Sequence, residues 1–152
     1  MNKSCPECGA KLSRETRSVS YTYKGHHIEI SQPGEWCPAC NEGVLSRDDM
    51  KATEKALHDF KARIDGLLTS DEVREIRKRI ALSQKAAAEI FGGGPNAFSR
   101  YERGEAMQMK AVDTLLRLLD KHKELVTEVK AMMPAGGSSS HIEGSGKDRR
   151  VV

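Results

Sequence analysis

The sequence predicts an α+β protein in which a small metal-stapled β-module with a long helix precedes an all-α domain of five helices. Two observations support this. Two Cys-x-x-Cys pairs enclose residues 18–30, where apolar and polar residues alternate with the period of a β-strand. From Ser46 onward, apolar residues recur at steps of three and four, the period of amphipathic helices. We therefore expect one domain over residues 1–68 and a second over residues 69–134.

Length and charge limit the possible functions. The 152-residue chain can bury one ordinary core or two small ones. Its formal net charge of +3 is too small to identify a nucleic-acid binder, so such a function must depend on where Lys and Arg lie. No apolar run approaches the roughly 18 residues of a membrane span, and the N-terminus has no signal-peptide pattern. We expect a cytoplasmic protein without a membrane partner.

The four cysteines are the strongest chemical signal. Cytosolic thiols stay reduced, which disfavours disulfides, and a thiol–disulfide active site normally needs one such pair. Four thiolates suit a closed tetrahedral zinc site, which has no open position for water and therefore indicates a structural metal. Gly9 and Asn41 follow the two pairs and tolerate the positive φ of tight turns. We predict one structural zinc per chain, with iron–sulfur, redox or unbound thiols as alternatives. The predicted ligands are Cys5, Cys8, Cys37 and Cys40.

The segment between the cysteine pairs predicts a hairpin. Residues 18–23 alternate Ser or Thr with Val or Tyr, which indicates a half-buried strand. Lys24-Gly25 suits a tight turn, and residues 27–30 form the returning strand, which Pro33-Gly34 is expected to end. His26 and His27 are assigned to the sheet surface, because four cysteines already complete a metal shell.

A long helix should pack onto this module. Ser46 is a good N-cap, and acidic residues occupy the first turn, where the helix dipole favours them. Gly66 is expected to end the helix and to place the domain boundary between Gly66 and Thr69. The predicted buried face consists of Met50, Thr53, Leu57, Phe60 and Ile64.

Residues 84–104 predict a helix, a glycine turn and a short second helix, which together form a helix-turn-helix with its second helix in the major groove of DNA. On a helix over residues 96–103, with Pro95 at its first position, polar residues share one stripe and Phe98 and Tyr101 point away. Arginine can read guanine and asparagine adenine, although a solvated helix face is the alternative. The predicted DNA-binding residues are Asn96, Arg100, Ser99, Arg103, Gln84 and Lys85.

The rest of the chain indicates how this motif is used. Five helices with a turn between the second and third are the plan of lambda-repressor-like (Xre-type) DNA-binding domains, and Met107, Met109 and Met132 are expected to pack between them. One such domain reads only a half-site, so apolar surface on the last helices predicts a homodimer on a palindromic operator. Residues 135–152 resemble an artificial flexible spacer, with a native basic tail that touches DNA phosphate as the alternative.

Both cysteine pairs, together with Leu82-Ser83-Gln84 and the segment Glu89–Gly104, resemble the MqsA (YgiT) type of antitoxin of type II toxin–antitoxin systems. Residues 115–122 continue the resemblance, which covers roughly residues 1–130. The resemblance implies a zinc-binding N-terminal domain that covers a ribonuclease toxin, and a dimeric C-terminal domain that represses its own operon. It also implies Asn96 and Arg100 as the base-reading pair. The chain departs from the family at residues 107–109, where prolines are usual, and matches it weakly over residues 21–30.

These observations predict a zinc-stabilised homodimeric antitoxin that neutralises a cognate toxin and represses transcription. The alternative is a free-standing regulator, without a toxin partner, that senses metal or oxidant through its thiolates. An enzyme is not expected, because no catalytic grouping, open metal site or phosphate loop is recognisable. Nucleic-acid binding by the cysteine module is disfavoured, since residues 1–68 carry ten basic and ten acidic side chains.

Overall fold

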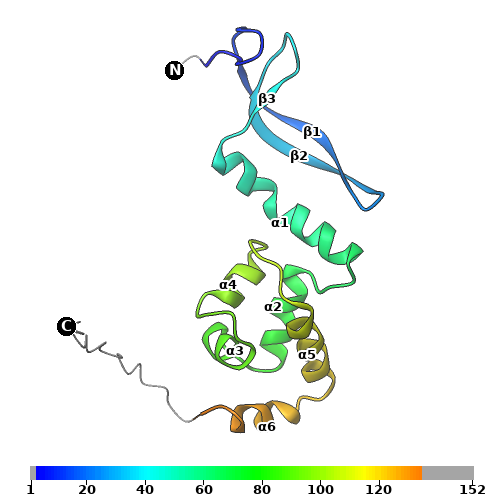
Figure 1. Cartoon of the computed structure of the whole chain (residues 1–152), viewed down its shortest axis with the longest axis vertical. Coiled ribbons are helices and arrows are strands. Elements are labelled where there is room, and N and C mark those ends of the chain that lie inside the picture. The colour runs from blue at the N-terminus through cyan, green and yellow to red at the C-terminus, as the bar shows by residue number, and fades with distance from the viewer. Residues whose placement is uncertain (1–2, 135–152) are drawn as a thin grey trace, which may run out of the picture.

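The computed structural model describes residues 3–134, so the predicted spacer at residues 135–152 lies outside the described residues. Figure 1 shows the sheet at one end of the molecule, helices α2–α6 at the other and α1 between them, which confirms a mixed α+β chain. None of the helices in the described part has both the length and the apolar character needed to cross a membrane. The elements are β1 (Ser13–Tyr23), β2 (His26–Trp36), β3 (Gly43–Val44), α1 (Arg47–Ile64), α2 (Ser70–Arg79), α3 (Gln84–Phe91), α4 (Ala97–Glu102), α5 (Lys110–Lys121) and α6 (Leu125–Ala131).

The sheet is antiparallel with the order β1-β2-β3. Lys24 (φ 46°) and Gly25 (φ 80°) form the two-residue turn between β1 and β2, as predicted, and two positive φ values are the signature of a type I′ hairpin turn. Our prediction that Pro33-Gly34 ends the second strand is wrong, because β2 continues through both residues to Trp36.

The hairpin register explains why proline is accepted within β2. In a type I′ hairpin the residues that flank the turn, Tyr23 and His26, form a hydrogen-bonded pair, and the two kinds of pair then alternate along the strands. Counting from that pair, Thr16 and Pro33 form a non-hydrogen-bonded pair, so the nitrogen of Pro33 faces away from β1. In the described residues β3 pairs with β2 only at Glu35 and Trp36, so the missing N–H of Pro33 breaks no ladder.

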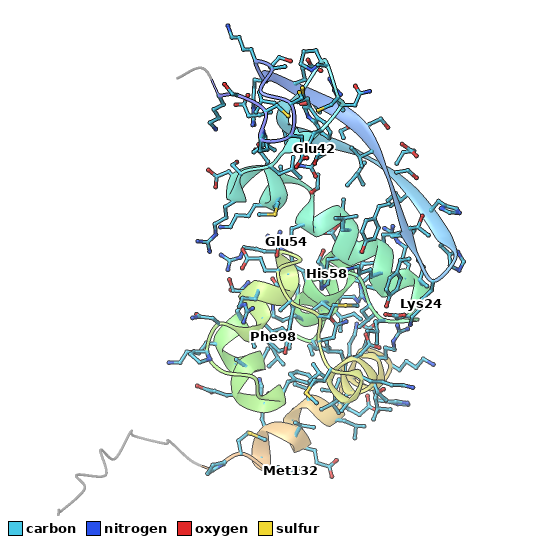
Figure 2. The ribbon with its side chains drawn as sticks, turned by 45° about the horizontal axis from the view of Figure 1, so that its top comes forward. Lys24, Glu42, Glu54, His58, Phe98 and Met132 are labelled. Carbon is cyan, nitrogen blue, oxygen red and sulfur yellow. The ribbon has the colours of Figure 1, made fainter. Side chains whose placement is uncertain are left out.

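Helix α1 begins with the predicted N-cap, since Ser46 and Asp49 form a reciprocal capping box. Its predicted buried face is partly wrong: Met50 is 54% exposed, whereas Asp49, His58 and Asp59, which were not assigned to that face, are buried. One side of α1 faces β2, where Thr53 Oγ1 donates to Gln32 Oε1 at 3.0 Å. The opposite side carries the buried residues His58 and Asp59, which face the helical half (Figure 2). Because α1 is covered from two sides, a single apolar stripe does not describe it.

Two side chains of α1 form hydrogen bonds to the helical half. The carboxylate of Asp59 accepts hydrogen bonds from the backbone N–H and the hydroxyl of Ser70 at 2.8 and 2.7 Å. A ring nitrogen of His58 lies 2.8 Å from the carbonyl oxygen of Ala106, in the loop between α4 and α5. The start of α2 and this loop are therefore both attached to the C-terminal half of α1.

The helices α2–α6 enclose one apolar cluster. Its most deeply buried large side chains are Phe98, Leu116, Leu119 and Val73, which come from α4, α5 and α2. The expectation that methionines pack between the last helices is wrong for Met109 and Met132, which are 73% and 67% exposed. Leucine, valine and phenylalanine side chains already fill the space between these helices, which leaves both methionines at the surface.

A buried ion pair crosses this helical half. Arg77 of α2 keeps only 12% of its side chain exposed and pairs with Glu102 of α4. Arg77 Nη2 donates to Glu102 Oε2 at 3.0 Å, and Nη1 donates to the carbonyl oxygen of Leu82 at 2.9 Å. Gln84 of α3 donates to the same carboxylate at 3.0 Å. One carboxylate thus connects α2, α3 and α4.

We predict that Arg77→Met destabilises the folded chain by about 3 kcal/mol, because Glu102 would stay buried without its charge partner. Urea denaturation at neutral pH measures this free energy. The matched control is Arg79→Met, because Arg79 pairs with Asp120 at 2.8 Å but is 46% exposed, and an exposed pair contributes at most about 1 kcal/mol. Equal losses in the two variants would contradict the structural role of the buried pair.

The same pair gives this difference a pH dependence. Desolvation raises the pKa of Glu102, but the hydrogen bonds from Arg77 and Gln84 outweigh it and hold that pKa below its ordinary value. A depressed carboxyl pKa stabilises the fold above the unfolded pKa of about 4.3, and that stabilisation is lost as the pH falls through the folded pKa. The stability difference between wild type and Arg77→Met should therefore shrink in acid.

Candidate metal centre and candidate nucleic-acid interface

Each cysteine pair lies in a tight turn, and the two turns have the same hydrogen-bond pattern. In the first turn Cys5 N donates to Ala10 O at 2.7 Å, and Gly9 N donates to Cys5 O at 2.9 Å. In the second turn Cys37 N donates to Glu42 O at 2.8 Å, and Asn41 N donates to Cys37 O at 3.0 Å. Gly9 (φ 75°) and Asn41 (φ 62°) adopt the positive φ that the sequence predicted.

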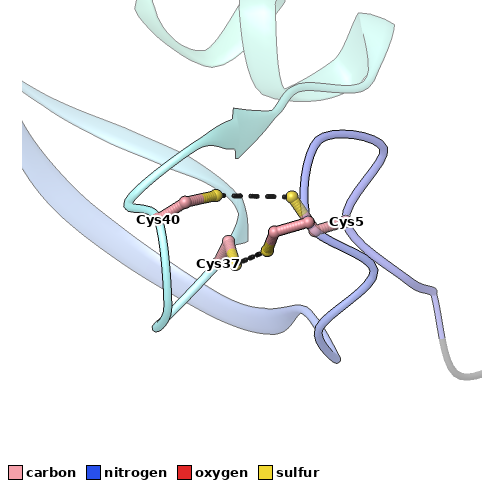
Figure 3. Close-up of side chains that lie close together, drawn as sticks. Cys5, Cys37 and Cys40 are labelled. Carbon is pink, nitrogen blue, oxygen red and sulfur yellow. Dashed lines mark hydrogen bonds between the residues drawn. The ribbon is translucent and has the colours of Figure 1, made fainter.

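The two turns face each other and bring four thiols together (Figure 3). All four Sγ atoms lie within 4.8 Å of one another. Across the turns, Cys5 Sγ lies 3.6 Å from Cys40 Sγ, and Cys8 Sγ lies 3.4 Å from Cys37 Sγ. Tetrahedral coordination with metal–sulfur bonds of about 2.3 Å requires sulfurs about 3.8 Å apart. The donor set and its spacing therefore fit a four-thiolate metal ion.

The acidity of the thiols also suits metal binding. The backbone N–H of Cys40, helped by that of Ala39 and by neighbouring thiols, lowers the pKa of Cys37 to about 6 against desolvation. The pKa of Cys40 is raised to about 12: the backbone N–H of Glu42 lowers it, but the Cys37 thiol, desolvation and the other thiols raise it by more. The Cys37 thiol thus ionises readily, whereas the nearby Cys40 thiol resists ionisation. A bound cation would favour the thiolate form of all four donors.

The module around the thiols is small. Cys5 and Cys37 are buried with Leu12, and Ala10 and Val44 pack against them. The strand β3, which the sequence did not predict, pairs with the end of β2 directly beyond the second cysteine turn. Such a core is too small to hold the two turns together without a cross-link. His26 and His27, at the opposite end of the hairpin from the thiols, are both exposed, which agrees with their predicted position on the sheet surface.

The second candidate site is α4. Phe98 and Tyr101 are buried, with exposed fractions of 0% and 9%, and Figure 2 shows Phe98 inside the helical half. Asn96, Arg100 and Arg103 are exposed on the opposite side, and Ser99 is half-buried. The exposed polar row and the buried aromatic face therefore lie as the sequence predicted.

The bounds of this helix differ from the prediction. It spans Ala97–Glu102, so Asn96 is the N-cap and Arg103 the C-cap, and Pro95 lies in the preceding turn instead of at the first helical position. Ala97 N donates to Gly94 O at 3.2 Å, a tight turn that delays the start of the helix beyond Pro95. The side chain of Asn96 makes no capping hydrogen bond, which leaves its amide available to a ligand.

The turn between α3 and α4 requires its glycines. Gly93 has φ 93°, and a Cβ atom there would lie 3.0 Å from Ala97 Cβ and 3.2 Å from the Tyr101 hydroxyl. The backbone of the turn therefore packs directly onto the inner side of α4. This contact holds α4 close to α3. The glycines of the turn therefore serve helix packing and do not form a phosphate-binding loop.

The remaining predicted residues lie at the start of α3 or at the end of α4. Ser83 caps α3, and Gln84 and Lys85 follow it at the surface. Gln84 is tied to the carboxylate of Glu102, and Arg103 pairs with Glu105 at 3.0 Å. Sequence reasoning missed the positioning role of Glu102. Its position four residues after Phe98 places both on the inner face of α4, which was the available signal.

Comparison with known proteins identifies the family. Residues 3–130 match the model of the family described as "Antitoxin component of bacterial toxin-antitoxin system, MqsA". The chain is 35% identical over 129 residues to "Antitoxin MqsA" of Escherichia coli (strain K12), and the match covers 83% of this chain and 98% of that protein. The family consists of binding proteins and not enzymes. An antitoxin has a toxin partner, so the match favours an antitoxin over a free-standing regulator. The chain belongs to the MqsA family of antitoxins from bacterial toxin–antitoxin systems.

Proposed function

We propose that this antitoxin neutralises a ribonuclease-type toxin through residues 1–68 and represses its own operon by binding palindromic DNA through residues 69–134. The observation that carries the DNA-binding proposal is the exposed row of Asn96, Arg100 and Arg103, backed by buried aromatic residues, on a short helix after a tight turn. Antitoxin function follows from the family. The division of labour between the two halves is the proposal.

The metal of the proposed mechanism is zinc, bound by Cys5, Cys8, Cys37 and Cys40. Four thiolates at tetrahedral spacing suit either zinc or iron, but a closed thiolate shell is typical of structural zinc. The bound metal supplies no chemistry at an open position, since the cysteines fill its coordination shell. Its role is to cross-link the two turns and so to hold the end of β2 against the N-terminal segment.

In the proposed DNA complex, α3 and α4 act as a helix-turn-helix. Asn96 and Arg100 are one turn apart and read bases in the major groove, because their side chains match adenine and guanine. Lys85 lies in the first turn of α3, where it can bind a phosphate. Arg103 exchanges its partner Glu105 for the DNA backbone on binding. Glu102 cannot take part, because Arg77 and Gln84 occupy its carboxylate.

A homodimer completes the proposed repressor. Exposed apolar side chains remain on the last two helices and before α5, namely Met109, Leu118 and Met132. These side chains are candidates for a dimer contact, and a two-fold dimer presents two copies of α4 to the two halves of a palindrome.

Removal of the metal tests the stapled module. Cys37→Ser should lose the metal and unfold the module, while helices α2–α6 keep their own core, so DNA affinity should stay within a few-fold of wild type. Elemental analysis, circular dichroism and a DNA-binding assay measure the three effects. Glu42→Gln is the control, because its exposed side chain adjoins the site without being a thiolate donor. Loss of metal and DNA binding together would contradict the independence of the halves.

Substitutions on α4 test base reading. Asn96→Ala and Arg100→Ala should each cost about 1–3 kcal/mol of specific binding free energy and leave nonspecific binding almost unchanged. Fluorescence anisotropy with the chain's own promoter DNA and with random-sequence DNA separates the two. Arg79→Ala is the control of equal charge, since Arg79 is engaged with Asp120 between α2 and α5. Wild-type affinity for the promoter in both α4 variants would show that α4 does not read it.

Co-expression tests the toxin partner. The product of the adjacent open reading frame, expressed alone, should arrest growth, and co-expression of this chain should restore it. Co-expression of residues 69–134 alone should fail to restore growth, because the proposed toxin-binding half is missing. If residues 69–134 restored growth, the toxin-binding surface would have to be assigned to the helical half.

A further inference from the structure

The outer edge of β1 is a long free strand edge. In the described residues β1 pairs with β2 only, so its eleven residues, Ser13–Tyr23, present their other edge to solvent (Figure 1). The pairing with β2 runs without a bulge over all eleven positions. Because the pairing is regular, this edge can accept another strand along its whole length.

The hairpin turn fixes which groups point outward. Because Tyr23 and His26 form a hydrogen-bonded pair, every second residue of β1 before Tyr23 directs its N–H and C=O away from β2. The acceptance of Pro33 opposite Thr16 independently supports this phase. The outward-directed backbone groups belong to Arg14, Thr16, Ser18, Ser20 and Thr22, and they recur about every 6.8 Å.

This edge lacks the usual protection. Natural edge strands carry lysine, proline, bulges or inward charges that prevent pairing with other chains. Residues 16–22 contain neither lysine nor proline, and their one charged side chain, Arg17, lies over the Trp36 ring, with its guanidinium carbon 5.0 Å from the ring centroid. Four of the outward residues, Thr16, Ser18, Ser20 and Thr22, have exposed side chains that are hydroxyl-bearing and uncharged. An unprotected edge of this kind is an aggregation hazard unless a partner covers it.

The edge is also rigid. The inner face of the strand is half-buried, with the ring of Tyr21 6.4 Å from that of Phe60 in an edge-to-face arrangement. At the hairpin tip, where Figure 2 labels Lys24, the Tyr23 hydroxyl donates to Asp65 at 2.9 Å. Both contacts fix β1 to α1, so binding a strand would need little ordering of this side of the interface.

We propose that the toxin docks by adding one of its own strands to the free edge of β1 at residues 16–22. The proposal rests on the proposed function and names the surface through which residues 1–68 bind. A ladder of alternating donors and acceptors is complemented by the backbone of an extended strand, which makes strand addition the matching mode of recognition. Main-chain pairing also suits a half-chain whose charges are balanced, because it does not depend on opposite net charge.

Ser20→Pro tests the proposal. Its ring would remove an outward N–H and block the edge, while no hydrogen bond to β2 is lost. Affinity for the purified toxin, measured by titration calorimetry, should fall about tenfold or more, with circular dichroism and metal content unchanged. Ser20→Ala is the matched control and should bind like wild type, because it keeps the backbone donor.

The outcomes separate this inference from the proposed function. No binding by wild type would overturn the toxin partner itself. Equal binding by wild type and Ser20→Pro would overturn the assignment of the toxin to the edge of β1 and leave the toxin partner standing. Dissociation of the homodimer by Ser20→Pro, seen by light scattering, would assign the edge to self-pairing and also overturn it. If Ser20→Pro does not fold, hydrogen exchange on wild type decides: the amides of residues 16, 18, 20 and 22 must become protected when toxin binds.

Discussion

The arrangement of this antitoxin depends on how α1 meets the helical half. The carboxylate of Asp59 accepts two hydrogen bonds from Ser70 at the N-terminus of α2, where the helix dipole also favours a negative charge. Lys55 lies between this carboxylate and that of Asp71, 3.1 Å from each. Desolvation raises the pKa of Asp59, but the hydrogen bonds from Ser70 and Lys55 keep it below its ordinary value, so the group stays charged. A charged group at this position holds the start of α2 to α1.

A close backbone contact supports the same junction. Gly104 follows α4 with a φ of 71°, a left-handed conformation that commonly ends a helix. A Cβ atom at this position would also lie 2.8 Å from the Cα of Lys55, so α1 passes directly against the loop that follows α4. One glycine therefore both ends α4 and admits α1. The exposed row of α4 and the cysteine module are connected through this contact.

Each half compensates for a small core in its own way. The N-terminal half has two cysteine turns over a few apolar side chains, and a metal ion fits between them. The helical half has a larger apolar cluster, but it orients its two short helices through the single carboxylate of Glu102. The groups proposed to contact DNA are thus positioned by residues that do not themselves reach the surface. The free edge of β1 is held in a similar manner by contacts on its inner face.

Local features were predictable from the sequence because they depend on neighbouring residues. The cysteine turns with Gly9 and Asn41, the Lys24-Gly25 hairpin and the cap at Ser46 follow from short-range backbone geometry. The inward and outward sides of α4 follow from helical period, which also placed Asn96, Arg100 and Arg103 at the surface. The four metal-binding candidates followed from their spacing and chemistry.

Contacts between distant segments were decided only by the tertiary structure. Periodicity cannot show that α1 is covered on two sides, so Met50 was wrongly placed in the core and the roles of His58 and Asp59 were missed. The burial of Arg77 depends on a carboxylate 25 residues away. Pro33 lies within β2 because the register and the short β3 leave its nitrogen without a partner to satisfy. The sequence by itself determined the tight turns, the α1 cap and the chemistry of the cysteines, whereas the end of β2, the strand β3 and the pairing of surfaces were decided by packing, because burial depends on residues far apart in the chain.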